Sequence, residues 1–334
     1  MKRKLVQKVK ITYVMLSAAL LGLHACSEDD ARQLSPTTES VVADISVNNG
    51  HLVFENRDIF DQTFTLLLSD QSKLNDWEQQ FSNYQSMRSA FYAIEATDDN
   101  VDELLDKHKD IITVTDRLGE QEAIMIIDDR ILATFFSNEG LLQIGDELYK
   151  AGYHSFYKIN AKEQALFEGG IEAISARSNA AIEAIPVERE VYEFEAPTAV
   201  NAKRIETCET RYDKKGRKRV KGEVFTTKIG ALYAGAGART KHQRKRLGIW
   251  WRSRTKQIRL QVTGEFEQYF GQVSTGPIPV NYDSGWESDD GREAYTFEFC
   301  ANVSCKFDII SMYGTHSCLC DDNVRRSCNT EITK

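Results

Sequence analysis

The residues with the clearest capacity for chemistry form a basic run that contains two adjacent tryptophans. The run consists of Lys241, Arg244, Lys245, Arg246, Trp250, Trp251, Arg252, Arg254 and Lys256. If residues 249–256 form a strand, alternate side chains share a face, so Trp250 would lie beside a row of cations. An exposed aromatic ring can stack on a sugar, and guanidinium groups pair with carboxylate, sulfate or phosphate. The predicted contacts for a glycan or acidic polymer are Trp250, Arg252, Arg254 and Lys256.

The alternative for the same residues is a solvated basic sheet face on which arginine stems cover Trp250.

Acidic residues give a weaker indication of a site. The turn from Asp283 to Gly291 surrounds Trp286 and could bind calcium through carboxylate oxygens, but its spacing does not fit an EF-hand loop. A glycoside hydrolase needs two carboxylates, and aspartates and glutamates are too widespread in this chain to identify such a pair.

Sequence motifs of common enzymes are absent from the chain. It contains neither G-x-S-x-G nor H-E-x-x-H, and its six histidines show no metal-ligand spacing. We therefore predict no catalytic residue, no metal ion and no cofactor.

Six of the seven cysteines lie in the C-terminal part of the chain. An even number of cysteines outside the cytoplasm favours disulfides, although sequence cannot choose among the possible pairings. Cys318 and Cys320 are too close along the chain to bridge each other comfortably, so we expect each to reach another cysteine. The alternatives are free thiols, or a zinc site formed by these two thiols, His316 and a further thiol. The disulfide candidates are Cys208, Cys300, Cys305, Cys318, Cys320 and Cys328.

The seventh cysteine, Cys26, ends an N-terminal segment typical of export signals. Lysines and an arginine precede the apolar run Ile11–Leu23, which is too short to span a bilayer but suits a signal peptide. Leu23, Ala25 and Cys26 resemble the lipobox of bacterial lipoproteins. The resemblance implies a signal peptide at 1–25, and lipid, including palmitate, on Cys26.

The residues after Cys26 indicate where the lipid holds the protein. Ser27–Asp30 resemble the acidic export tag of surface lipoproteins from Bacteroidota-type bacteria, and the polar residues 26–50 are typical of a flexible tether. Asn138–Lys150 is similar to a segment that recurs in uncharacterised Bacteroidota lipoproteins, with a looser resemblance over 51–160. These resemblances imply a lipid-anchored outer-membrane protein at the cell surface, and no activity.

Charge divides the chain into two parts. The net charge is −8, yet the segment Arg204–Leu260 holds 18 Lys and Arg against four acidic residues, a net charge of +14. The remainder therefore carries −22, which favours two modules with different surfaces. An acidic chain expected outside the cell is not expected to bind nucleic acid.

The first module is expected to be mainly helical. Asn56 can cap a helix in which Phe60 and Phe64 share a face, and similar periodicity continues to residue 105. The apolar runs 124–127 and 131–136 fit either a helix or a buried strand. Short strands are expected within 141–159 and a helix over 161–185.

From about residue 203 the apolar pattern changes to period two. Ile258, Leu260 and Val262 alternate with polar residues, and Tyr295–Phe299 shows the same pattern. Several such strands with Gly-rich turns indicate an antiparallel sandwich or barrel. The Gly/Ala-rich segment 230–238 is expected to form a loop or a close backbone contact.

The predicted fold class is α+β. We expect an α-rich N-terminal domain at 51–185 with a small β-hairpin element, a linker at 186–202, and an antiparallel β-sandwich-like domain at 203–334. The leading functional prediction is a non-catalytic surface module that binds a glycan, a polyanion or an envelope protein. The alternatives are a hydrolase with paired carboxylates and a structural subunit of a surface assembly. Sequence does not indicate the oligomeric state.

Overall fold

The computed structural model describes residues 44–117, 119–171, 174, 181–190, 204–205, 207–288, 292–301 and 304–333. All of them belong to one compact unit, Thr37–Lys334. The predicted signal peptide, Cys26 and most of the predicted tether lie outside the described residues. The end of the tether segment is a strand, β1 (Ile45–Asn48), which pairs antiparallel with β2 (His51–Phe54).

The helices of the described residues are short and lie in the first half of the chain. They are α2 (Arg57–Ser69), η1 (Gln71–Lys73), α3 (Leu74–Glu78), α4 (Met87–Ala93), α5 (Val101–Lys107), α6 (Arg130–Phe135) and η2 (Ala161–Phe167). Strands run between them, namely β3 (Ile112–Arg117), β4 (Glu120–Met125), β5 (Leu141–Ile144), β6 (Glu147–Lys150), β7 (Ser155–Asn160) and β8 (Glu183–Glu190). The prediction of an α-rich N-terminal domain is therefore wrong, because strands form a large part of this region.

Side-chain caps explain where two of these helices begin. The Asn56 side chain accepts a hydrogen bond from the Ile59 amide over 3.1 Å, so the predicted cap of α2 is confirmed. Asp129 caps α6 in the same way, accepting from the Leu132 amide over 2.7 Å. This cap resolves the ambiguity of the two apolar runs, since the run before Asp129 ends β4 and the run after it forms α6.

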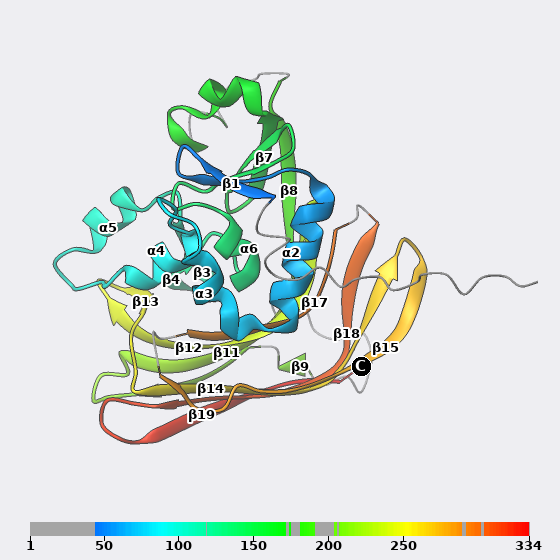
Figure 1. The fold of residues 1–334 in the computed structure, drawn as a ribbon. Coiled ribbons are helices and arrows are strands. Elements are labelled where there is room, and N and C mark those ends of the chain that lie inside the picture. The colour runs from blue at the N-terminus through cyan, green and yellow to red at the C-terminus, as the bar shows by residue number, and fades with distance from the viewer. Residues whose placement is uncertain are drawn as a thin grey trace, which may run out of the picture. The chain divides into compact units, whose positions relative to one another are not determined.

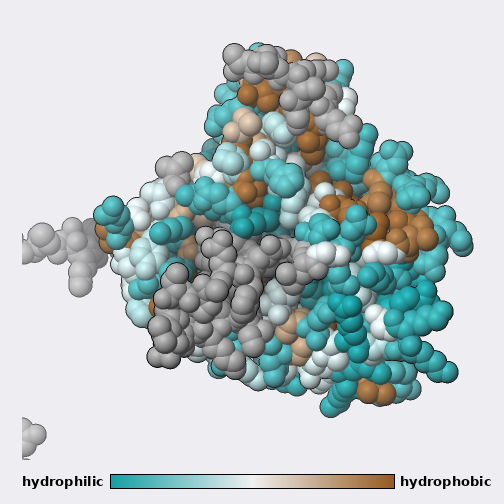
Figure 2. Space-filling view, turned by 180° about the vertical axis from the view of Figure 1, so that it is seen from behind, coloured by the Kyte–Doolittle hydropathy of each residue, from teal (hydrophilic) through white to brown (hydrophobic). Residues whose placement is uncertain are grey.

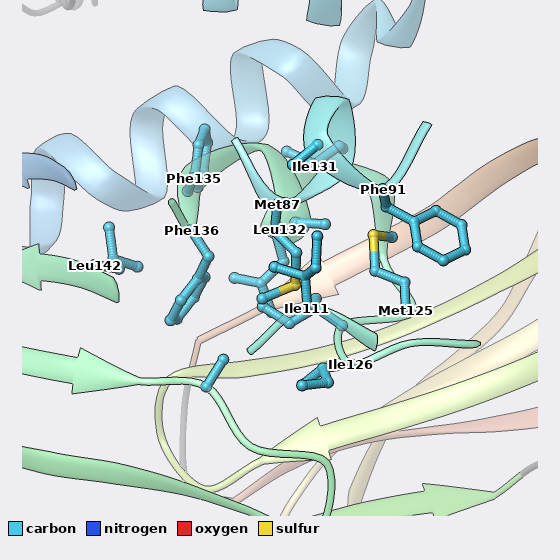
Figure 3. Packing of buried hydrophobic residues seen from close by; sticks show 14 of the residues in the cluster. Met87, Phe91, Ile111, Met125, Ile126, Ile131, Leu132, Phe135, Phe136 and Leu142 are labelled. Atoms are coloured by element: carbon cyan, nitrogen blue, oxygen red, sulfur yellow. The ribbon is translucent and has the colours of Figure 1, made fainter. Parts of the chain in front are cut away.

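The core of the first half is built from aromatic and aliphatic side chains of these helices and strands. Figure 3 shows Phe135 and Phe136 at the end of α6, with Met87 and Phe91 of α4 nearby. The ring of Phe135 packs edge-on against Phe60 at a centroid distance of 5.4 Å. The aromatic residues noted in the sequence are therefore core residues here.

The second half of the described chain consists of strands. They are β9 (Arg204–Ile205), β10 (Thr207–Tyr212), β11 (Lys218–Ile229), β12 (Tyr233–Arg246), β13 (Ile249–Arg252), β14 (Gln257–Phe270), β15 (Val273–Asp283), β16 (Glu287–Ser288), β17 (Arg292–Cys300), β18 (Cys305–Leu319) and β19 (Arg325–Thr333). They belong to two sheets, and this sandwich-like arrangement agrees with the predicted mixed fold (Figure 1).

The first sheet joins strands from both halves of the chain. Its order is β1-β2-β5-β6-β7-β8-β11-β12-β13-β4-β3, with β10 on β11 and β17 on β12. The pairs β2–β5 and β13–β4 are parallel, so they bring together segments that are distant in sequence. The region 161–185, predicted to be a helix, is helical in η2 and at residues 170, 171 and 174, but its end is the start of β8; residues 172–173 and 175–180 lie outside the described residues. β8 also includes the first residues of the predicted linker.

The hairpin of β11 and β12 is buried on both faces, between the helices and the second sheet (Figure 1). One face carries Ala234, Ala236 and Ala238, which pack against apolar residues of the second sheet. The opposite face carries charged side chains toward β4. A Cβ on Gly237 would lie 2.6 Å from the backbone oxygen of Tyr295, which confirms that the Gly/Ala-rich segment makes a close backbone contact.

The second sheet has the order β15-β14-β18-β19-β9, with β16 on β14. Two disulfides connect it to the first sheet. Cys208 of β10 pairs with Cys328 of β19, and Cys300 of β17 pairs with Cys305 of β18, with Cα–Cα distances of 5.6 and 6.4 Å. The expectation that Cys318 and Cys320 reach other cysteines is wrong, because their Sγ atoms lie 2.8 Å from each other.

Candidate functional site

Many cations of the basic segment lie inside the molecule, in a buried ion layer between β4 and the β11–β12 hairpin. Side chains of a strand alternate between its faces, so Arg239, Lys241 and Lys245 of β12 all point toward this layer. The intervening residues, such as Ala238, face the second sheet. This alternation of cations with small residues is visible in the sequence and is the signal that could have identified the layer.

Glu122 of β4 is the centre of the layer. It is buried, and its Oε2 accepts from Lys221 Nζ over 2.6 Å and from Arg219 Nη2 over 3.1 Å. Its Oε1 accepts from Lys241 Nζ over 2.6 Å and from Gln243 Nε2 over 3.0 Å. Burial disfavours the charged form, but the surrounding cations together hold the pKa of Glu122 well below its ordinary value.

A second set of ion pairs extends the layer toward α6. Arg239 is fully buried; its Nε donates to Glu223, and its Nη1 lies 2.7 Å from Asp128 Oδ1. Lys221 Nζ connects the two sets, because it also lies 2.8 Å from Glu223 Oε1. The layer therefore links β4, β11, β12 and the residue that precedes the α6 cap.

A cavity of about 20 Å³ adjoins the layer, with Glu122, Lys241 and Gln243 on its polar side and Phe91 and Met125 among its apolar walls. This volume suits about one water molecule. Burial lowers the pKa of Lys241 to about 8, although Glu122 and Glu223 oppose the shift. The cavity is too small for a sugar ring, so these charged groups hold strands together without access for a glycan.

The four predicted contact residues do not form one exposed face. Trp250 is fully buried, with the Arg219 guanidinium 4.1 Å from its ring centroid, so its ring is not available to stack on a sugar. Arg252 Nη2 donates to the carbonyl of Tyr92 over 2.7 Å. Arg254 is 62% exposed beside Glu95, and Lys256 Nζ donates to Asn323 over 2.6 Å. Only Arg254 and Lys256 of the four are exposed, and both lie beyond the end of β13.

The zinc site and the calcium site considered from the sequence do not fit the described residues. His316 hydrogen-bonds to Thr240 and Thr330 and is not joined with the two thiols into a zinc site. Asp283 of the acidic turn pairs with Arg259, and residues 289–291 of that turn lie outside the described residues. Within the described part of the chain, no group of three or more His, Cys, Asp or Glu side chains is arranged around a metal position.

A different surface gathers groups suited to binding. The solvent-facing side of the second sheet, here called the outer face, is polar because residues that alternate with its apolar core point to solvent. The side chains of this face lie in rows across the strands β14, β18 and β19. In one row, Gln261 pairs with Thr315, and Thr315 pairs with Asn329. The outer face comprises Gln257, Arg259, Gln261, Thr263, Tyr313, Thr315, Ser317, Leu319, Arg325, Ser327, Asn329 and Glu331.

Two aromatic rings lie on or beside the outer face. Tyr313 is 47% exposed. Trp286 precedes β16, and the guanidinium carbons of Arg325 and Arg259 lie 4.9 and 5.9 Å from its ring centroid. Because both arginines belong to the outer face, the Trp286 ring lies over that face. Sequence analysis recognised the polar side of β14 but did not identify the strands that extend it.

The other exposed large apolar side chains of the described residues do not belong to the outer face, and two of them, Phe270 and Val273, pair across β14 and β15. Figure 2 shows hydrophilic residues over much of one side of the molecule, with hydrophobic residues in separate patches. Tyr313 is the one exposed large apolar residue of the described chain that belongs to the outer face. The whole group consists of Leu247, Phe270, Val273, Tyr313 and Val324.

No described helix has the length and apolar character that crossing a membrane requires.

No protein-family model matches the chain, and no curated protein matches it in sequence. Among solved structures, a DUF4848 family protein from Bacteroides thetaiotaomicron is similar over 86% of this chain and 99% of that chain, at 12% identity and a TM-score of 0.27. A likeness of this size carries no argument about the fold or the activity.

Proposed function

We propose that this chain is a non-catalytic module of a bacterial cell envelope that binds a glycan through the outer face of its second sheet. The observation that carries the proposal is the position of Tyr313. Its exposed ring lies between Thr263 and Glu331 in rows that also carry hydroxyl and amide side chains, with the Trp286 ring at the edge of the same surface.

The composition of the outer face matches the chemistry of a sugar. A sugar ring has apolar C–H faces, which pack on aromatic rings, and hydroxyl groups at its rim, which need donors and acceptors. Gln261, Thr315 and Asn329 supply both kinds of group. Strand geometry spaces such side chains by about 4.8 Å across strands and about 6.6 Å along them, so several hydroxyl groups can be met at once.

A glycan fits the structure better than an acidic polymer does. Arg219, Lys221, Arg239 and Lys241 are buried in ion pairs, so their charges are not presented to a polyanion. On the outer face, Arg259 is paired with Asp283.

The two alternative functions have less support. The buried carboxylates of the ion layer adjoin a cavity of about 20 Å³, which does not favour a glycoside hydrolase. A structural subunit could pair through the edge strand β15, but Pro277 and Pro279 remove two amide donors from that strand.

The position of the module follows from its N-terminus. Lipid on Cys26 would attach the chain to the outer membrane, and the acidic residues after it support exposure at the cell surface. The polar residues that follow would separate the folded unit from the lipid, so the outer face could reach an external glycan.

A glycan array tests the proposal. The full-length chain should be retained by a restricted set of glycans, and Tyr313→Ala and Trp286→Ala should each reduce retention. The matched control is Phe270→Ala, because Phe270 is 42% exposed but lies at the far end of β14. Equal retention of the wild type and the three variants would contradict the proposal. A wild-type chain that no glycan retains would also contradict it.

A further inference from the structure

Cys318 and Cys320 are held together at the C-terminal end of β18, an interior strand of the second sheet. Cys318 lies in β18 and Cys320 directly follows that strand, so both side chains point to the same side. Both residues are fully buried, and their Sγ atoms are 2.8 Å apart. They pack with Val220 and the partly buried ring of Tyr212.

This geometry is suited to a covalent bond between the two sulfurs. Residues two apart in a strand have Cα atoms separated by about 6.6 Å, which is within the range of about 4.4–6.8 Å found in disulfides. The Sγ–Sγ distance of 2.8 Å is already close to the bonded distance of about 2.05 Å. Closing the bond therefore requires only a small movement of the side chains.

The surroundings of Cys320 favour its thiolate. The Cys318 thiol, the Tyr212 hydroxyl and the Arg326 guanidinium lower the pKa of Cys320 to about 6, while burial opposes them. Tyr212 also hydrogen-bonds to His242, and Arg326 stacks on the Tyr212 ring with its guanidinium carbon 3.9 Å from the centroid. The other charged groups nearby form ion pairs, namely Lys218 with Asp321 and Arg326 with Asp322.

We propose that Cys318 and Cys320 are a redox couple that alternates between a dithiol and an intrachain disulfide by exchange with an external disulfide. The Cys320 thiolate attacks one sulfur of the external disulfide, forming a mixed disulfide and releasing one thiolate. Cys318 then loses its proton to a released thiolate and attacks Cys320 Sγ, which expels the second thiolate. Two protein thiols lose two electrons and two protons, and the external disulfide becomes two thiols.

Access to the pair would require the neighbouring turn to open. The turn Asp321–Asn323 directly after Cys320 is exposed, and it is closed by a hydrogen bond from the Asn323 amide to the Cys320 carbonyl over 2.9 Å. Opening this turn would uncover Cys320 without separating the sheets. The two disulfides join other cysteines, and Cys328 Sγ lies 4.0 Å from the carbonyl oxygen of Val220, which packs against the pair.

Peptide mass analysis of the full-length chain tests the couple. After incubation with oxidised glutathione and quenching with N-ethylmaleimide, the peptide containing Cys318 and Cys320 should lack two hydrogens and carry no maleimide. Reduced glutathione should return two maleimide-reactive thiols while Cys208–Cys328 and Cys300–Cys305 stay linked. A pair that stays reduced in oxidised glutathione, or stays oxidised in reduced glutathione, would overturn the proposal.

Two serine variants separate the roles of the thiols. Cys318→Ser should accumulate a glutathione adduct on Cys320, because the second attack is lost. Cys320→Ser should form its adduct on Cys318 at least about tenfold more slowly near pH 7, because the stabilised thiolate is absent. The rate of the first attack in the wild-type chain should rise with a midpoint near pH 6. Equal rates in the two variants, with unchanged circular dichroism, would also overturn the assignment of Cys320 as nucleophile.

Discussion

Glu122 of β4 accepts a hydrogen bond from Lys241 of β12 over 2.6 Å, although 119 residues separate them in the chain. Both side chains are buried, so the pair lies away from solvent screening. Its geometry explains why a segment with a net charge of +14 does not present all its cations at the surface. Part of that charge joins the β11–β12 hairpin to β4, a strand of the same sheet.

Replacing Glu122 with Gln should strongly destabilise the fold. The variant leaves Lys241, Lys221 and Arg219 without their shared carboxylate, and breaking a buried ion pair costs about 3–5 kcal/mol. Urea unfolding measures the change in the free energy of unfolding.

The matched control for this prediction is Glu120→Gln in the same strand. Glu120 also contacts cations but lies nearer the surface, with 22% of its side chain exposed, so its loss should cost about 1 kcal/mol or less. Equal losses in the free energy of unfolding would show that the buried ion layer contributes no more to stability than ion pairs nearer the surface.

His316 should make stability depend on pH between about 4 and 6.5. Burial lowers its pKa to about 4 in the folded chain, while the unfolded side chain titrates near 6.5. The unfolded state therefore binds more protons in this window, so stability is lost as pH falls from 6.5 to 4. The full loss from this group is roughly 3 kcal/mol.

The His316→Gln variant isolates this contribution. Glutamine can still bond with Thr240 and Thr330, which flank the imidazole, but it does not titrate. Urea unfolding at a series of pH values should show a shallower slope for the variant between pH 4 and 6.5. An unchanged slope would mean that other groups cause the acid sensitivity.

Gly222 should be intolerant of a side chain. A Cβ at this position would lie 2.0 Å from Cδ2 of His316, and overpacking of this kind costs about 1–3 kcal/mol. Gly222→Ala should therefore lower the free energy of unfolding in the wild-type background. The same substitution should cost less in a His316→Ala background, and a cost that is equal in both would exclude the contact as its cause.

Local signals in the sequence predicted local structure well. The Asn56 cap and the alternation through Ile258, Leu260 and Val262 correspond to α2 and β14. The strand content of the N-terminal half was underestimated because short apolar runs there fit a helix or a buried strand, and only the pairing decides between them. β4 pairs with β13 through Trp250 and Glu122, a contact that periodicity within either segment cannot indicate.

The site was harder to predict than the elements. The position of Trp250 beside cations was predicted, and cover of its ring by arginine was the stated alternative. Sequence could not identify Arg219 as the residue whose guanidinium packs on the ring, because Arg219 belongs to another strand. The outer face also depends on three strands in register. Tyr313 has no partner within its own segment that would distinguish it from a core aromatic.

The lipid anchor can be tested independently of the folded unit. Cys26→Ser should abolish incorporation of labelled palmitate and release the protein from the membrane fraction, because no other cysteine follows the export signal directly. Palmitate labelling and membrane fractionation of expressing cells measure both effects. Continued labelling of the variant would contradict the predicted lipobox.

Calorimetric titration with the best-retained glycan tests binding by the outer face most directly. Tyr313→Ala and Trp286→Ala should each weaken the affinity by about tenfold or more, equivalent to about 1.4 kcal/mol, while Phe270→Ala should bind like the wild type. Wild-type affinity in both outer-face variants, with their folding intact, would show that the glycan binds elsewhere.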